Sequence, residues 1–225
     1  RSRGLGDVYK RQPLGLLGGS LLFGPIVDRF GHKALLLLSC LVVLLGLEGI
    51  AFFTSIPLLQ VSIIGIGLGG GILNGETNAL VADISNEAEK GSRLSLLGAF
   101  YGIGALGIPV LLSFLSEYYS FEIILQGTGM VMLIGILFCL GIRFPAPKQP
   151  QGFPIKEGLG LLKESSLLLL SFILFFQSGI EGVCNNWTTL YLGQTTGIPE
   201  NRALIALTCM VAGLTVALSL IHISE

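Results

Sequence analysis

Two carboxylates stand inside long apolar stretches of the sequence, Glu76 in the glycine-rich run 65–83 and Glu181 in a later run. Both stretches are long enough to cross a membrane, where an ionised carboxylate costs about 2.5 kcal/mol or more. Burial favours the neutral acid, which suits a carrier of protons. Glu76 could instead be a structural carboxylate paired with Lys or Arg, but the apolar stretches contain neither. The pattern therefore favours ion or solute handling.

Helical spacing sorts the polar residues of the run 65–83 onto two sides. One face carries residues spaced by four, three and four: Gly67, Gly71, Asn74 and Asn78. The small residues of this face allow close helix packing, and its asparagines could bond a polar ligand. Another side carries Glu76 together with Gly65, Gly69 and Asp83.

A second polar stripe runs along the later apolar stretch. Its members are spaced by four, four and three residues: Gln177, Glu181, Asn185 and Thr188. Either a hydrogen-bonded seam between helices or a face that binds solute hydroxyl groups would explain these groups within a span. Trp187 lies one turn away, where it could stack on a sugar ring or sit in the interfacial aromatic belt.

The composition is typical of a membrane protein with several spans. Hydrophobic residues make up 52% of the sequence and charged residues 12%, against roughly a quarter charged in a soluble domain. The sequence has no basic patch with interleaved aromatics that would indicate nucleic-acid binding. It also has no nucleophile–histidine–acid set and no metal-ligand spacing, and we expect His32 in a loop. We therefore expect neither an enzyme nor a cofactor or metal, and a lipid bilayer as the surroundings.

The two ends, residues 1–12 and 218–225, are expected to be artefacts. Residues 7–12 are what one strand of a common transposon-based sequencing adapter encodes, and residues 218–225 are what its reverse complement encodes. A genuine basic N-terminal arm is the alternative. On the adapter interpretation both segments are excluded from fold reasoning, and the remainder is an internal piece of a longer chain.

Seven apolar runs are expected to be membrane helices, the first and last incomplete: residues 14–26, 34–53, 57–81, 94–115, 121–142, 166–192 and 203–217. The predicted fold is therefore all-α and polytopic. The longest connection, residues 144–165, is proline-rich at its start, and its residues 155–162 could form a short amphipathic helix. We expect one lobe over residues 13–143, this linker, and the start of a second lobe over residues 166–217.

Basic residues alternate between the connections. Lysine and arginine gather in residues 27–33, 84–93 and 143–165, whereas the connections near 54–56 and 117–120 have none. Arg202 is the exception on the opposite side. The positive-inside rule therefore places the three basic connections in the cytoplasm.

A charged turn between the first two runs carries the strongest short motif. Its residues at fixed spacing are Gly24, Asp28, Arg29, Gly31 and Lys33. Glycine suits a tight turn, and Asp28, at a helix boundary, could accept backbone hydrogen bonds or pair with a cation. This motif resembles the loop between helices two and three of the major facilitator superfamily, which implies a conformational latch between two lobes. A solvated charged turn is the alternative.

The resemblance extends along nearly all of residues 13–217. It implies helices two to about eight of a twelve-helix transporter that works as a monomer in the cell membrane. Segments 75–77, 93–96, 98–109 and 179–187 resemble the fucose/hexose:proton symporter-like branch, which implies that Glu76 exchanges the coupled proton. Gly98 stands where many relatives have histidine, and Ala79 where fucose transporters have proline, so no particular sugar is implied.

The sequence thus predicts secondary transport of a small polar solute, by preference a sugar, together with a proton through alternating access. The candidate solute contacts are Asn74, Asn78, Gln177, Glu181, Asn185 and Trp187. An efflux antiporter of the same superfamily is the first alternative. A sensor or scaffold that does not transport, built on the same fold, is the second.

Overall fold

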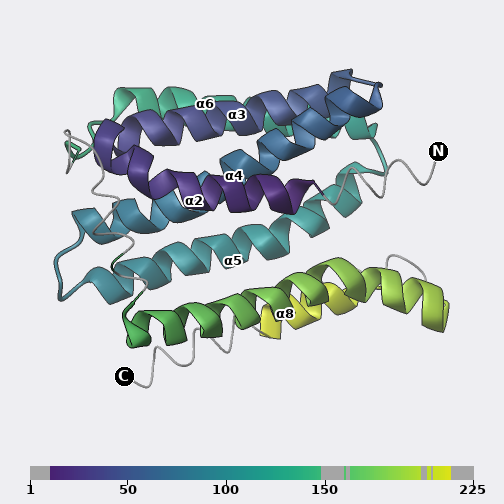
Figure 1. Ribbon diagram of the computed structural model, residues 1–225. Helices are drawn as coiled ribbons and strands as arrows, with labels where there is room; N and C mark the ends of the chain where they lie inside the picture. Colours follow the sequence, from purple (N-terminus) through teal and green to yellow (C-terminus); the bar gives the residue numbers. More distant parts are fainter. Residues whose placement is uncertain (1–10, 148–159, 161–162, 199–201, 204, 214–225) are drawn as a thin grey trace. The chain divides into compact units, whose positions relative to one another are not determined.

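The computed structural model describes residues 11–147, 160, 163–198, 202–203 and 205–213 (Figure 1). These residues form helices and connections, with no strand among them. The long helices are α2 (Gln12–Phe30), α3 (His32–Phe52), α4 (Ile56–Ile84), α5 (Lys90–Leu115), α6 (Phe121–Gly141) and α8 (Ser165–Thr196). The predicted all-α fold is confirmed.

Most helix ends fall within a few residues of the predicted ones, and one difference has a consequence for the charged motif. Helix α2 continues to Phe30 instead of ending near residue 26. Asp28 and Arg29 therefore occupy the last turn of a helix, and Gly31 alone separates α2 from α3. The loop expected over residues 27–33 is therefore too long, whereas Asp28 lies at a helix boundary as expected.

Five helices are long and apolar enough to cross a membrane, among the described residues: α3, α4, most of α5, α6 and residues Ser165–Cys184 of α8. Many of their large apolar side chains are exposed, including Leu45 (62%) and Phe175 (70%). Such surfaces suit a lipid solvent. The last predicted span is helical at 202–203 and 205–213, and its remainder lies outside the described residues, as does most of the predicted amphipathic segment 155–162.

The chain divides into two compact units. The first comprises Arg1–Leu94 with Leu112–Phe153, and so contains α2, α3, α4 and α6. The second comprises Ser95–Leu111 with Pro154–Glu225, and so contains the middle of α5 and all of α8. The lobe boundary expected at residues 144–165 stays a prediction.

Glycines set the spacing of helices in the first unit. A Cβ atom added to Gly67 or Gly71 of α4 would overlap the backbone oxygen of Gln12 or Leu16 in α2. Across the interface, a Cβ on Gly19 of α2 would overlap the backbone oxygen of Leu68. The two backbones are therefore in direct contact, and the packing interpretation of Gly67 and Gly71 is the correct one.

Helix α4 approaches α3 in the same way on another side. A Cβ on Gly69 would lie 2.8 Å from the backbone oxygen of Ser39 and 2.6 Å from a methyl carbon of Val43. Helix α3 in turn packs on α6, where the Glu48 carboxylate lies against Gly129. Helix α4 thus packs against both α2 and α3, at backbone separations that only glycine allows (Figure 1).

The sharp connection between α2 and α3 depends on the backbone of Gly31. This residue has φ +83° and ψ 163°, which residues with a Cβ rarely adopt, and its N–H donates to the Val27 oxygen at 2.8 Å. Gly31→Ala should therefore lower the free energy of unfolding by about 1–3 kcal/mol. Gly18→Ala, an open position in α2, should be neutral or stabilising by up to about 1 kcal/mol. Equal melting temperatures of the two variants in detergent would contradict this assignment.

Candidate functional site

Glu76 is the most deeply buried charged side chain in the described residues, with 0% of its surface exposed. It lies on α4 seven residues after Gly69 and seven before Asp83, so the three share one side of the helix. Because Gly69 admits the α3 backbone, this side of α4 faces α3. The spacing of Glu76 and Asp83 therefore places both carboxylates at the interface between α4 and α3.

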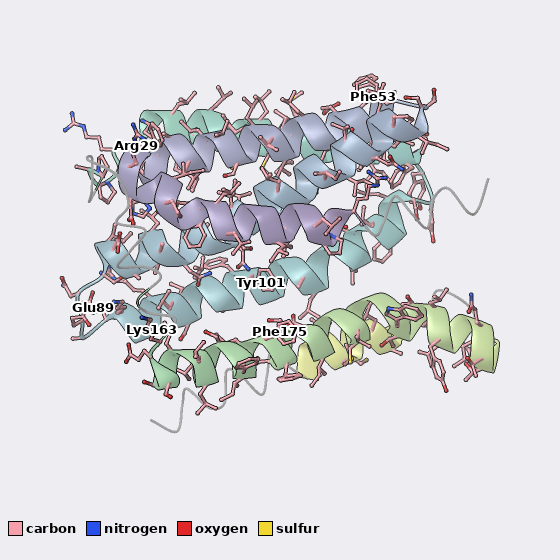
Figure 2. All side chains as sticks on the ribbon, viewed as in Figure 1. Arg29, Phe53, Glu89, Tyr101, Lys163 and Phe175 are labelled. Carbon is pink, nitrogen blue, oxygen red and sulfur yellow. The ribbon has the colours of Figure 1, made fainter. Side chains whose placement is uncertain are left out.

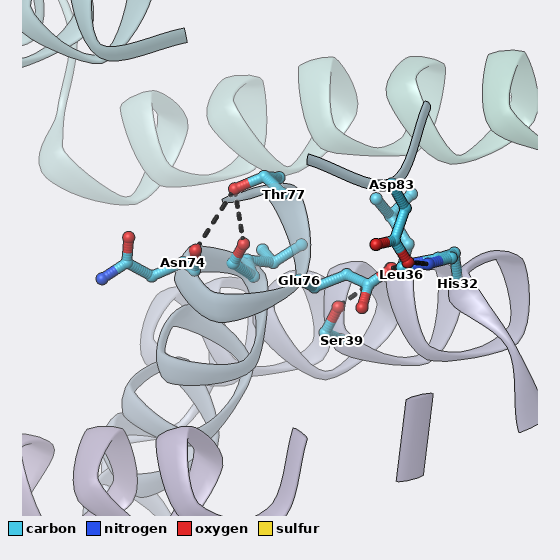
Figure 3. Close-up of polar contacts among 8 residues, drawn as sticks. His32, Leu36, Ser39, Asn74, Glu76, Thr77 and Asp83 are labelled. Atoms are coloured by element: carbon cyan, nitrogen blue, oxygen red, sulfur yellow. Dashed lines mark hydrogen bonds and ion pairs between the residues drawn. The ribbon is translucent and has the colours of Figure 1, made fainter. Parts of the chain in front are cut away.

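His32, the first residue of α3, bridges these carboxylates. Its Nδ1 lies 2.8 Å from Glu76 Oε1 and its Nε2 lies 3.0 Å from Asp83 Oδ2 (Figure 3). His32 is itself buried, with 5% of the residue exposed. Two hydrogen bonds from one ring therefore join the start of α3 to two turns of α4.

This contact corrects two sequence-based expectations. His32 was expected in a loop, yet it opens α3, because α2 and α3 are separated by Gly31 alone. Glu76 was expected to have no cationic partner, yet His32 can be one when protonated. The seven-residue spacing of Glu76 and Asp83 could have indicated this contact. It puts both carboxylates on one face of α4, near a helix end that the charged turn can reach.

The second oxygen of Glu76, Oε2, is buried and has no hydrogen-bond partner among the described residues. An unsatisfied buried acceptor of this kind costs roughly 1–3 kcal/mol, and more when it is charged. Protonation of this oxygen would remove the charge from the interior.

Asn74 and Asn78 lie elsewhere on α4. Both are exposed, and Asn78 Nδ2 donates to the Asn74 backbone oxygen at 2.7 Å. Asn74 extends from the opposite side of the helix to Glu76 (Figure 3). The described residues thus leave the Asn74 side chain open for a polar ligand, on a different face from the buried carboxylate.

The predicted stripe on α8 belongs to the second unit. Gln177 and Glu181 are exposed, and Trp187 is 62% exposed. Asn185 lies in the same helix, but its side chain is outside the described residues. Their role in solute contact stays a prediction.

The residues of the charged motif have separate surroundings. Lys33 Nζ donates to the backbone oxygens of Leu140 (2.7 Å) and Ile142 (2.9 Å), and so caps the C-terminus of α6. The Arg29 guanidinium carbon lies 5.3 Å from the centre of the Phe30 ring. In this unit the motif therefore ties the start of α3 to the end of α6, while Asp28 is half-buried beside it.

The parts of the three basic connections that the structure describes within the first unit lie at one end of that unit. His32 reaches Asp83 near the end of α4, Lys33 reaches the end of α6, and an Arg93 N–H lies 3.4 Å from the Ile84 oxygen. Arg29 and Glu89 lie at this end and Phe53 at the other (Figure 2). Connections rich in lysine and arginine thus lie at one end of the unit, and the connections without them lie at the other end.

Comparison with known proteins decides the family. The model of the Major Facilitator Superfamily matches residues 12–224. The chain belongs to the major facilitator superfamily. It is a multi-pass membrane protein, and its family points to a transporter rather than an enzyme.

Individual relatives differ in their named substrates. The multidrug resistance protein MdtH of Aeromonas hydrophila is 30% identical over 166 residues, which cover 73% of this chain and 40% of that protein. The D-xylose transporter of Levilactobacillus brevis is 30% identical over 149 residues, 64% of this chain and 31% of that protein. A solved structure of the peptide transporter POT superimposes with a TM-score of 0.56 at 14% identity, covering 89% of this chain and 46% of that one, and supports the fold. The chain thus spans less than half the length of these proteins.

Proposed function

We propose that this chain is part of a secondary transporter that moves a small polar solute, by preference a sugar, together with a proton through alternating access. The observation that carries the proposal is Glu76, a fully buried carboxylate within a membrane-spanning helix. Its unsatisfied oxygen and its bond to a titratable histidine suit reversible protonation. Intramembrane carboxylates of this kind mark proton pathways.

The solute part of the proposal rests on amide and carboxylate groups within the spans. Asn74 and Asn78 offer hydrogen-bonding groups on an exposed face of α4, and Gln177 and Glu181 do so on α8. Sugar hydroxyl groups are bound by such side chains. The relative named as a D-xylose transporter supports the same class of solute.

The orientation proposed for the chain places the basic end of the first unit in the cytoplasm. Residues 27–33 and 84–93 and the start of 143–165 supply its basic side chains. The membrane potential and anionic lipids favour lysine and arginine on that side. Asp83, near the end of α4, would then face the cytoplasm.

The experiment uses the complete protein encoded at the source locus, placed in membrane vesicles with a pH electrode in the medium. D-xylose is the first probe, followed by other monosaccharides. Symport predicts that adding the solute makes the medium more alkaline, because protons enter the vesicles with it. Solute uptake that leaves the medium unchanged, in the presence of a permeant counter-ion, would overturn the proposal.

Efflux by proton antiport is the second candidate. The similarity to the multidrug resistance protein MdtH favours it. The same vesicles separate the two, because an antiporter loads with substrate as protons leave, so the proton and the solute move in opposite directions. Binding of D-xylose without exchange across the membrane would instead favour a sensor or scaffold.

A further inference from the structure

His32 joins an inner carboxylate to an outer one. Glu76 has none of its side chain exposed, His32 has 6% and Asp83 has 19%. The three groups therefore form a line of increasing exposure, from the interior of the unit toward its basic end. Each neighbour in the line is within hydrogen-bond distance of the next, at 2.8 and 3.0 Å.

The two hydrogen bonds fix the number of protons between the three groups. Each hydrogen bond needs one hydrogen. Either the imidazolium donates to two carboxylates, or a neutral imidazole donates to one carboxylate and accepts from one carboxylic acid. Both arrangements hold two protons and a net charge of −1. They interconvert when one proton shifts along a hydrogen bond, so the ring can accept a proton at one nitrogen and release one at the other.

Glu76 can accept a third proton on its second oxygen. Glu76 Oε2 is buried and makes no hydrogen bond to any described group. A proton on this oxygen would bring the net charge of the three groups to zero. A neutral cluster is favoured in a low-dielectric interior, where a net charge is costly.

Other charged groups near His32 are directed elsewhere. From α3 itself, Lys33 binds the carbonyl oxygens at the end of α6. From α2, Arg29 stacks on Phe30, and Asp28 is the remaining titratable group at that helix end. From α4 the facing groups are Glu76 and Asp83. The imidazole thus has a carboxylate on each side and a direct link to no other described charge.

We propose that His32 is a proton relay that carries protons between Asp83 at the membrane surface and Glu76 in the interior. From the imidazolium form, the proton on Nδ1 passes to Glu76, whose carboxyl group turns so that this proton takes the position of Oε2. The ring then flips so that its remaining N–H donates to Glu76, and a proton from water that binds Asp83 passes to the ring nitrogen now facing Asp83. The three groups then hold three protons and no net charge. The inference deepens the proposed function, because it names the route by which the coupling carboxylate exchanges its proton with the cytoplasm.

The test follows protonation of Glu76 directly in the purified complete protein. The infrared carbonyl band of the protonated acid is assigned by its loss in Glu76→Gln, and its rate of appearance is recorded after a rapid drop in pH, without solute. His32→Arg keeps a cation with hydrogen-bond donors for both carboxylates but cannot release a proton. Asp83→Asn keeps a hydrogen-bond acceptor for the ring but cannot take up a proton. Glu89→Gln, an exposed carboxylate at the same end paired with Arg93, is the matched control.

The relay predicts that the band appears more slowly in both His32→Arg and Asp83→Asn, by about a hundredfold, the usual worth of a positioned proton-transfer group. Glu89→Gln should match the wild type. A wild-type rate in either relay variant would overturn the proposal, because the proton would then reach Glu76 by another route. A histidine that only clamps α3 to α4 would give that result in His32→Arg, since arginine preserves the clamp.

The outcome is independent of the vesicle experiment. The band is measured without solute, so a relay can be present in a protein whose solute moves without protons. Conversely, proton-coupled uptake combined with a wild-type rate in these variants would leave the proposed function standing and remove His32 from it.

Discussion

In the complete transporter, Glu76→Gln is expected to reduce solute-driven proton uptake to background while solute exchange across the membrane continues. Glutamine cannot change its charge, yet it keeps the size of the side chain and can still hydrogen-bond His32. It therefore resembles the protonated acid, which we assign to the solute-loaded states. Active accumulation should be lost, because it needs release of the proton, whereas counterflow of labelled solute does not.

The control for this change is Glu48→Gln. Glu48 is another carboxylate within a membrane-spanning helix, half-buried against Gly129 of α6. It lies outside the bridge made by His32, so its replacement should leave proton uptake intact. Undiminished proton uptake in Glu76→Gln, or equal losses in both variants, would remove Glu76 from the coupling step.

Gly71→Ala is expected to damage the fold of the first unit, because Gly71 is buried in the contact between α4 and α2. Its Cβ would overlap the backbone oxygen of Leu16, and neither backbone can move without separating α2 from α4. Overpacking of this kind costs about 1–3 kcal/mol. The melting temperature and the yield of folded protein in detergent should both fall.

Gly70→Ala is the matched control. The neighbouring glycine has no described atom within 4 Å of an added Cβ. Alanine is the better helix former by about 1 kcal/mol, so this variant should melt at the same temperature as the wild type or above it. Similar melting temperatures for the two variants would mean that the close approach of α2 to α4 is absent from the folded protein.

Most of the fold follows from the sequence, because lipid requires long apolar helices and these are visible as runs. The predicted run 121–142 and helix α6 (Phe121–Gly141) agree almost residue for residue. Run ends within charged segments were less accurate. Helix α2 passes through Asp28 and Arg29 because hydrogen bonding continues up to Gly31, and hydropathy does not report hydrogen bonds.

The candidate site was predicted only in part. The burial of Glu76 follows from its place in an apolar run, but its partner His32 is 44 residues away, in a segment that hydropathy treats as polar. Bringing them together requires the Gly69 contact of α4 with α3 and the sharp turn at Gly31. Both are properties of packing, which one-dimensional spacing does not contain. The spacing of Gly67 and Gly71 likewise allowed close helix packing, but it did not identify α2 as the helix that they contact.

The most direct test of Glu76 as the coupling site is the affinity for solute as a function of pH, compared between the wild type and Glu76→Gln. If the protonated acid belongs to the solute-binding form, wild-type affinity is complete at low pH and falls as pH rises through the titration of Glu76, because binding and protonation are linked reciprocally. Glu76→Gln should bind tightly at every pH. The same fall in affinity in Glu76→Gln would contradict the proposal, since another group would then carry the proton.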